Sequence, residues 1–218
     1  MFDLDGTLLN TEKAIVSSFE QVLGKYKPDL VLSEEDKVSF LGPTLQESFQ
    51  KYAPEFDTDQ LVKEYRECNR EAHFTGIIQP FPHVKELLDW LKENGYPIAI
   101  ASSKKKETVE LGLEVTGLRD YFEVIVGVED VEKPKPDKES LVKTYSRLGY
   151  GPDNAIYIGD STGDIICAKN AGVYSIAFVS NMLKDKELKD ARPNKVIYDM
   201  AEIKDILQEK HPWTSDLS

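Results

Sequence analysis

The sequence has few cysteines, few histidines and no long apolar run, and each shortage excludes a class of protein. Two cysteines in 218 residues, Cys68 and Cys167, are too few and too far apart for a disulfide framework or a cysteine-rich metal site. We expect buried thiols in a reducing compartment, which favours the cytoplasm. The three histidines form no i,i+3 or i,i+4 pair. No apolar stretch reaches the roughly 20 residues that span a bilayer, and the basic-then-apolar pattern of a secretory signal is absent.

Positive charge is also scarce. Lys and Arg number 27 against 39 Asp and Glu, so the net charge is −12. Such a surface repels nucleic acid and anionic membranes, and neither is expected as a partner. A small anion can still be bound where cations gather locally. The lysines that could supply such a field are Lys104, Lys105, Lys106, Lys133 and Lys135.

The opening stretch Met1-Phe2-Asp3-Leu4-Asp5-Gly6-Thr7 is typical of a strand end followed by a turn. Residues i and i+2 of a strand point to the same side, so Asp3 and Asp5 can face one site. Two carboxylates that close need a shared proton or a cation, and a divalent cation with oxygen ligands would satisfy both. The alternative is an ordinary polar turn after a short strand.

The remaining chain divides into two patterns. Residues 11–76 show helical periodicity throughout, with helix starts at Ser33 and Thr44 and a longer helix over 57–74. From residue 83, helices alternate with short apolar strands, which indicates a parallel sheet covered on both faces. We therefore predict a Rossmann-like, doubly wound α/β core with a small helical-bundle cap inserted after its first strand. The expected ranges are 1–10 plus 77–210 for the core, 11–76 for the cap and 211–218 for a flexible tail.

Polar residues follow the predicted strands at the edge where open parallel sheets bind ligands. In chain order they are Asp3 and Asp5, Ser102, the loop Lys133-Pro134-Lys135-Pro136, and Asp160 with Asp164. A carboxylate can accept a phosphoryl group as an aspartyl phosphate, and Mg²⁺ offsets the repulsion between the two anions. A lysine and a hydroxyl can hold the remaining phosphoryl oxygens. Each residue alone fits a cap, a turn or a solvated charge, but the four features together favour phosphoryl transfer.

The four motifs resemble those of the haloacid-dehalogenase superfamily, in the same order and over essentially the whole chain. The helical insertion resembles the C1-type cap of subfamily IA. The loop Leu41-Gly42-Pro43-Thr44-Leu45 and the run from Thr108 to Glu132 are similar to the phosphoglycolate-phosphatase-like branch, and within it to bacterial inorganic pyrophosphatases. In one departure, only Met1 and Phe2 precede Asp3, where the family has several apolar residues: either the given chain starts late or the strand is unusually short.

The resemblance implies a role for each motif residue. Asp3 is the nucleophile, and Asp5 is first the acid for the leaving group and then the base for water. Ser102 and Lys133 bind phosphoryl oxygens. The carboxylate of Asp3, the main-chain carbonyl of Asp5 and Asp160 hold Mg²⁺, with Asp164 behind them. The substrate-binding residues expected around them are Gly6, Thr7, Gly42, Pro43, Thr44, Ser103 and Lys104.

Three of these residues, Gly42, Pro43 and Thr44, lie in a loop of the helical cap between two short helices. The main-chain N–H groups that open the helix at Thr44 offer an anion a binding place, whereas an ordinary turn between helices is the alternative. No aromatic-rich stretch near the motifs could stack a base. The sequence therefore predicts an Mg²⁺-dependent phosphatase, monomeric or homodimeric, that acts on a small phosphate compound. Pyrophosphate and phosphoglycolate are expected ahead of nucleotides and sugar phosphates.

Two other readings stay open at this point. A phosphosugar mutase of the same superfamily shares all four motifs. A non-catalytic module, such as a phospho-accepting receiver domain, uses similar residues. A receiver domain is disfavoured, because it is about half this length and carries its acceptor aspartate in mid-chain. A binding protein on the same fold is disfavoured because no motif residue is missing.

Overall fold

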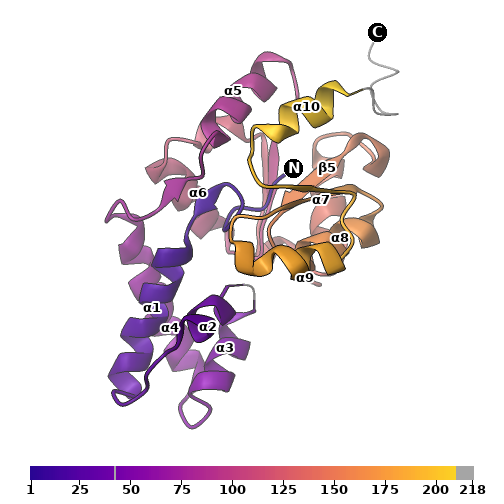
Figure 1. The fold of residues 1–218 in the computed structure, drawn as a ribbon. Helices are drawn as coiled ribbons and strands as arrows, with labels where there is room; N and C mark the ends of the chain where they lie inside the picture. The colour runs from indigo at the N-terminus through magenta and orange to yellow at the C-terminus, as the bar shows by residue number, and fades with distance from the viewer. Residues whose placement is uncertain (42, 210–218) are drawn as a thin grey trace. The chain divides into compact units, whose positions relative to one another are not determined.

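The computed structural model describes residues 1–41 and 43–209 (Figure 1). The chain forms two compact units. Residues 1–10 and 80–209 make the core unit, and Thr11–Gln79 make the helical unit. The second boundary thus lies at 79/80, against the expected 76/77. The expected flexible tail, 211–218, lies outside the described residues.

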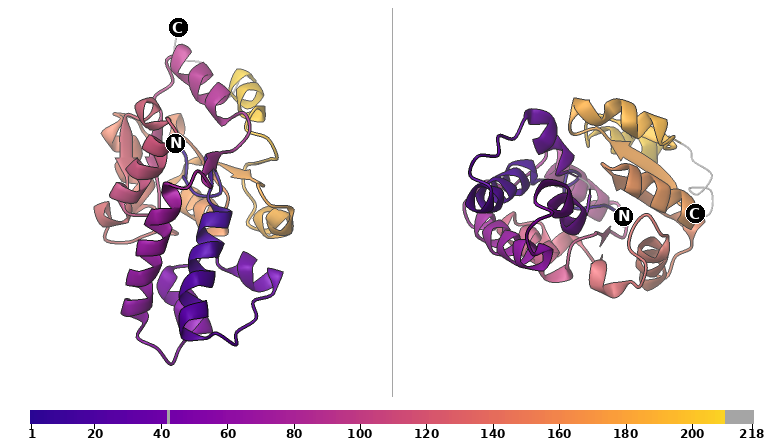
Figure 2. Two further views of the ribbon diagram at one scale, coloured as in Figure 1. Left: turned by 90° about the vertical axis from the view of Figure 1, so that its left-hand side faces the viewer. Right: turned by 90° about the horizontal axis from the view of Figure 1, so that it is seen from below.

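The helical unit contains the four helices that its periodicity predicts. They are α1 (Glu12–Tyr26), α2 (Glu34–Ser39), α3 (Leu45–Tyr52) and α4 (Thr58–His73). Helices α1 and α4 lie side by side (Figure 2). Ser33 and Thr44 each begin a helix with a capping box, in which a hydroxyl accepts the N–H three residues on.

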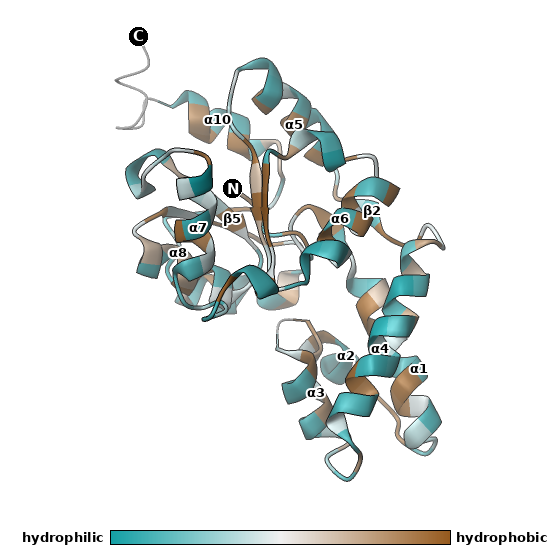
Figure 3. Ribbon diagram, turned by 180° about the vertical axis from the view of Figure 1, so that it is seen from behind, coloured by the Kyte–Doolittle hydropathy of each residue, from teal (hydrophilic) through white to brown (hydrophobic). Residues whose placement is uncertain are grey.

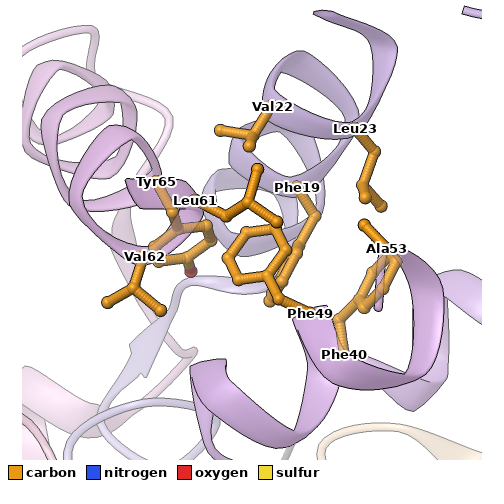
Figure 4. Packing of buried hydrophobic residues seen from close by; sticks show 9 residues of the cluster. All are labelled: Phe19, Val22, Leu23, Phe40, Phe49, Ala53, Leu61, Val62 and Tyr65. Carbon is orange, nitrogen blue, oxygen red and sulfur yellow. The ribbon is translucent and has the colours of Figure 1, made fainter. Parts of the chain in front are cut away.

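Aromatic rings fill the core of the helical unit (Figure 4). The ring of Phe19 stacks on Phe40 with 4.2 Å between centroids, and Tyr65 packs against it at 4.6 Å. Phe49 completes the group and is fully buried. Because this core is built from its own helices, the unit has its own source of stability.

The core unit is built on a parallel sheet. Its strands are β3 (Ala99–Ala101), β4 (Val124–Val126), β5 (Ile156–Gly159), β6 (Tyr174–Phe178) and β7 (Lys195–Ile197). The first residues of the chain lie between β3 and β5. There the Phe2 N–H donates to the carbonyl of Ala99, and the Asp3 N–H donates to that of Ile158, each over 2.9 Å. The order is therefore β4, β3, residues 1–3, β5, β6 and β7.

Both faces of this sheet are covered. Successive side chains of a strand point to opposite faces, and the neighbours Tyr157 and Ile158 on β5 are both buried. Figure 3 shows the strands as apolar and the outer sides of the helices as largely hydrophilic. The helices are α5 (Val84–Glu93), α6 (Lys106–Val115), α7 (Glu139–Arg147), α8 (Thr162–Ala171), α9 (Asp185–Asp190) and α10 (Glu202–Gln208). The doubly wound α/β prediction is confirmed.

Several short elements complete the fold. Strands β1 (Leu9–Asn10) and β2 (Gln79–Pro80) pair with each other. The 3₁₀ turns are η1 (Arg119–Tyr121), η2 (Val128–Asp130), η3 (Pro152–Asn154) and η4 (Met182–Lys184). The sequence did not predict α9 or these turns. Among the described residues, no helix has both the length and the apolar character needed to cross a bilayer.

Candidate active site

Three carboxylates meet at the carboxyl ends of the central strands. Asp3 follows the first strand residues, and Asp160 follows β5, its neighbour in the sheet. Asp164 is in the first turn of α8. Each of the three is at least nine-tenths buried and offers an oxygen within 4.8 Å of the oxygens of the other two. The sheet thus gathers the acidic residues of two motifs that are far apart in sequence.

The turn after Asp3 brings the chain close to Asp160. Gly6 has a φ of +71°, a conformation that side chains with a Cβ rarely adopt. A Cβ at this position would lie 2.2 Å from Asp160 Oδ2, so only glycine fits. Thr7 is fully buried, and its hydroxyl lies 3.5 Å from Asp160 Oδ1. Gly6 and Thr7 therefore shape the site around Asp160.

The lysine in the site is Lys135 and not Lys133, which corrects the sequence-based assignment. Lys135 Nζ lies 2.8 Å from Asp3 Oδ1 and 2.7 Å from Asp164 Oδ1, and its side chain is 7% exposed. Lys133 is exposed. The loop contains two Lys-Pro pairs, and the motif Lys-Pro-x-Pro matched the first. The second pair, Lys135-Pro136, was the available signal.

Tyr157 supports Lys135 from the face of β5 opposite Ile158. The tyrosine hydroxyl accepts a hydrogen bond from Lys135 Nζ over 2.9 Å and donates to the carbonyl of Ala101 over 2.8 Å. An ammonium group has three hydrogens, and Lys135 Nζ has four acceptors around it: Asp3, Asp164 and Tyr157 within 2.9 Å, and the Ala101 carbonyl at 3.3 Å. The sequence reading missed Tyr157, because it counted that position only as part of an apolar strand.

Asp5 and Lys104 face each other beside this cluster. Lys104 Nζ lies 3.0 Å from Asp5 Oδ1, but the angles at these atoms do not fit a hydrogen bond, and both atoms are shielded from solvent. The contact is therefore an ion pair without directional bonding. The Asp5 carboxylate is not one of the three clustered carboxylates, so any part of Asp5 in metal binding falls to its carbonyl.

Ser102 follows β3 and points its hydroxyl into a turn. It is buried, and its Oγ accepts the Lys104 N–H over 3.2 Å. Because a hydroxyl can also donate, accepting this bond leaves the Ser102 hydroxyl hydrogen available to a further acceptor. Ser103, by contrast, is exposed.

A further lysine, which the sequence reading also missed, pairs with Asp160. Lys184 Nζ lies 2.9 Å from Asp160 Oδ2. Lys184 belongs to no motif, and only the fold brings it to the site. Asp164 is held differently, since its Oδ2 accepts the N–H and the hydroxyl of Ser161 in a capping box. With Lys135 on Oδ1, both oxygens of Asp164 are engaged, which suits an orienting role.

Burial and mutual repulsion change the acidity of these groups. Burial, reinforced by the neighbouring aspartates, raises the pKa of Asp3 to about 7 despite Lys135. Burial also raises the pKa of Asp160. For Asp164, Lys135 and the hydrogen bonds outweigh burial and lower the pKa. Burial alone would lower the pKa of Lys135, but Asp164 and Asp3 hold it above its ordinary value. Asp3 and Asp160 are therefore harder to ionise than ordinary aspartates, whereas Lys135 keeps its positive charge.

This arrangement fits a divalent cation. Four carboxylates, those of Asp3, Asp5, Asp160 and Asp164, face the ammonium groups of Lys104, Lys135 and Lys184, which leaves one net negative charge when all four are ionised. A buried, all-oxygen donor set of this kind matches the ligands that Mg²⁺ prefers. Adding such an ion would reverse the net charge and make room for an anionic substrate.

The residues of the helical unit that were expected to bind substrate are Gly42, Pro43 and Thr44. Thr44 is the N-cap of α3, and both its N–H and its hydroxyl donate to Glu47 Oε2 over 2.8 Å. Those two donors are therefore engaged and are not free for an anion. Pro43 is exposed, and Gly42 lies outside the described residues. A substrate-binding role for the three residues stays a prediction.

Comparison with known proteins gives a consistent result. The family model described as haloacid dehalogenase-like hydrolase matches residues 1–178. A protein from Bacillus cereus (strain AH820), named pyrophosphatase PpaX, is 36% identical over 210 residues, which cover 96% of this chain and 95% of the relative.

Solved structures share the fold. A structure described as a haloacid dehalogenase-like hydrolase from Bacteroides fragilis matches with a TM-score of 0.81 and 30% identity, over 93% of this chain and 97% of that one. A structure described as β-phosphoglucomutase from Thermotoga maritima matches with a TM-score of 0.78 and 24% identity, over 96% and 98% of the two chains. The second likeness concerns the fold alone.

Proposed function

The chain belongs to the haloacid dehalogenase-like hydrolases and is a phosphatase of that family, and we propose that it hydrolyses a small anionic phosphate compound, pyrophosphate first, through an aspartyl phosphate at Asp3. The observation that carries the proposal is the buried cluster of Asp3, Asp160 and Asp164 with Lys135 between two of its members. A buried carboxylate held against an ammonium group, beside further carboxylates that could hold a metal, is arranged for attack on phosphorus.

The proposed reaction has two steps. In the first, an oxygen of Asp3 forms a bond to phosphorus while the bond to the leaving oxygen breaks, and Asp5 gives that oxygen a proton. In the second, Asp5 takes a proton from water, and the water oxygen attacks phosphorus and releases phosphate and free Asp3. General acid–base help of this kind is typically worth roughly 10²- to 10⁴-fold in rate.

The other residues of the site hold the reacting groups in place. Lys135 fixes the orientation of Asp3, and the Ser102 hydroxyl is free to donate to a phosphoryl oxygen. Asp3, Asp160 and the Asp5 carbonyl would hold Mg²⁺, with Asp164 orienting the set. When bound, Mg²⁺ would neutralise charge between the carboxylates and the phosphoryl oxygens.

Pyrophosphate is the first candidate substrate because the relative from Bacillus cereus bears the name of a pyrophosphatase. The charge balance of the site supports a compact and highly charged anion. Lys104, beside Asp5, could contact its second phosphate group. The two free thiols, Cys68 and Cys167, support a reducing compartment, and we propose the cytoplasm.

A panel of phosphate compounds tests the proposal. Wild-type protein with Mg²⁺ is expected to release phosphate from pyrophosphate faster than from phosphoglycolate, nucleotides or sugar phosphates. Asp3→Asn should lose several orders of magnitude in rate, because an amide cannot attack phosphorus. Asp5→Asn should fall by roughly 10²- to 10⁴-fold.

Two results would contradict the proposal. Near-normal turnover by Asp3→Asn would exclude the covalent mechanism. Phosphate release that requires an added sugar bisphosphate would favour a mutase, the second reading of this fold. Circular dichroism of each variant checks that a loss of rate is not a loss of structure.

A further inference from the structure

The turn η4 directs a charged side chain inward and its apolar side chains outward. The Lys184 side chain is 13% exposed, whereas Met182 and Leu183 are 67% and 73% exposed. A 3₁₀ turn has three residues per turn, so its side chains point in different directions. Burying Met182 or Leu183 would be favourable, and burying an ammonium group is not. Packing alone would therefore turn an apolar side chain inward.

The ion-pair partner of Lys184 explains why this lysine, and not Met182 or Leu183, points inward. Its Nζ lies 2.9 Å from Asp160 Oδ2, and Asp160 is itself nine-tenths buried. The other two lysines of the site are committed elsewhere, since Lys135 bridges Asp3 and Asp164, and Lys104 faces Asp5. Lys184 is thus the counter-ion of one particular carboxylate in the cluster.

We propose that Lys184 is a resident counter-ion that neutralises Asp160 in the metal-free protein and lowers the affinity of the site for its divalent cation. This inference rests on the proposed function, because it takes Asp160 to be a metal ligand. Lys184 is a positioning residue in this scheme and makes no bond to the substrate.

The positive charge of Lys184 should stabilise the metal-free protein but weaken the binding of a metal ion. Without a metal, the ammonium group offsets repulsion among Asp3, Asp160 and Asp164 and so stabilises the fold. With a metal, the same ammonium group lies close to a second cation and opposes its binding. Two charges several ångströms apart in a partly buried site interact strongly enough to change a binding constant by about tenfold or more. The lysine therefore keeps the metal exchangeable.

The test measures metal binding directly, without substrate. Isothermal titration of metal-free protein with Mg²⁺ would compare wild type with Lys184→Met, which removes the charge, and Lys184→Gln, which keeps a hydrogen-bond donor but no charge. Lys186→Met is the matched control, because Lys186 is exposed two residues further along and its loss changes the net charge equally. Thermal unfolding of each protein, with and without Mg²⁺, is the second readout.

Both Lys184 variants are expected to bind Mg²⁺ about tenfold more tightly than wild type and to unfold at a lower temperature when metal-free. Lys186→Met should match wild type in both measurements. Unchanged or weaker binding by Lys184→Met would overturn the inference. So would Lys184→Gln behaving as wild type, since the hydrogen bond and not the charge would then matter. Failure of the wild type itself to bind Mg²⁺ would instead reject the metal site, and with it both proposals.

Discussion

Lys135 Nζ donates to Asp3 Oδ1 over 2.8 Å, so an ammonium group is held directly against the carboxylate proposed to attack phosphorus. The same nitrogen reaches Asp164, and it therefore joins the proposed nucleophile to the acidic residue that begins α8. This contact makes the two Lys-Pro pairs of the loop unequal. One lysine is part of the site, and the other lies in solvent.

The two loop lysines should therefore differ sharply when replaced. Lys135→Met should abolish phosphate release and lower the free energy of unfolding by about 3 kcal/mol, because it leaves buried carboxylates without their partner. Lys133→Met, the matched control, should keep near-normal rate and stability, since its side chain is exposed. Phosphate assays and urea unfolding measure the two effects. The reverse result would restore Lys133 as the residue that binds phosphate.

Magnesium binding should weaken as the pH falls through about 7. In the metal-free protein the pKa of Asp3 is raised to about 7 from its ordinary 3.8, mainly by burial. A metal must displace the proton that Asp3 holds below that pH, so affinity should drop by up to about tenfold per pH unit. A titration with Mg²⁺ at pH values on either side of 7 measures this dependence.

The same pKa shift determines how the stability of the metal-free protein changes with pH. Between about pH 4 and 7 the folded state keeps a proton on Asp3 that the unfolded state has released. Stability should therefore fall as the pH rises through this window, and the gain on adding Mg²⁺ should be larger above pH 7 than below it. Asp3→Asn is the control and should lose most of this dependence. An equal gain at both pH values would contradict the assignment.

Gly6 should not tolerate a side chain. Gly6→Ala would place a Cβ 2.2 Å from Asp160 Oδ2 and force a φ of +71° on a residue that resists it. We expect displacement of Asp160, loss of metal binding and a stability loss of about 1–3 kcal/mol. Gly163→Ala is the control. A Cβ there meets Ser161 Oγ at an ordinary 3.6 Å, and alanine favours the helix. Titration with Mg²⁺ and thermal unfolding distinguish the two variants.

Calcium should inhibit the enzyme, and removal of all divalent cations should stop it. Mg²⁺ requires octahedral geometry at about 2.1 Å, whereas Ca²⁺ accepts more ligands at about 2.3–2.6 Å. A larger ion can take both oxygens of Asp3 and so occupy the one needed for attack. The measurement is phosphate release in excess chelator and then with Mg²⁺ and increasing Ca²⁺. Activity that persists in chelator would exclude the metal-dependent mechanism.

The motif residues were predictable because local chemistry and strand order specify them. Asp3, Ser102 and Asp160 each follow an apolar segment, and parallel strands place all such ends at one edge of the sheet. The helix starts at Ser33 and Thr44 were predictable for a similar reason, since a capping box involves residues only three positions apart.

The fold class, the acidic cluster and the family are therefore encoded in local residue patterns. The lysines that serve the cluster are selected by packing between distant segments. Lys133 and Lys135 are equivalent by motif and by charge, and the path of the loop alone turns the second one toward Asp3. The places of Tyr157 and Lys184 in the site could not be predicted from the sequence for the same reason. Their partners are set by packing between segments that are distant in sequence, and a buried ion pair or hydrogen bond leaves no pattern in the residues on either side of it.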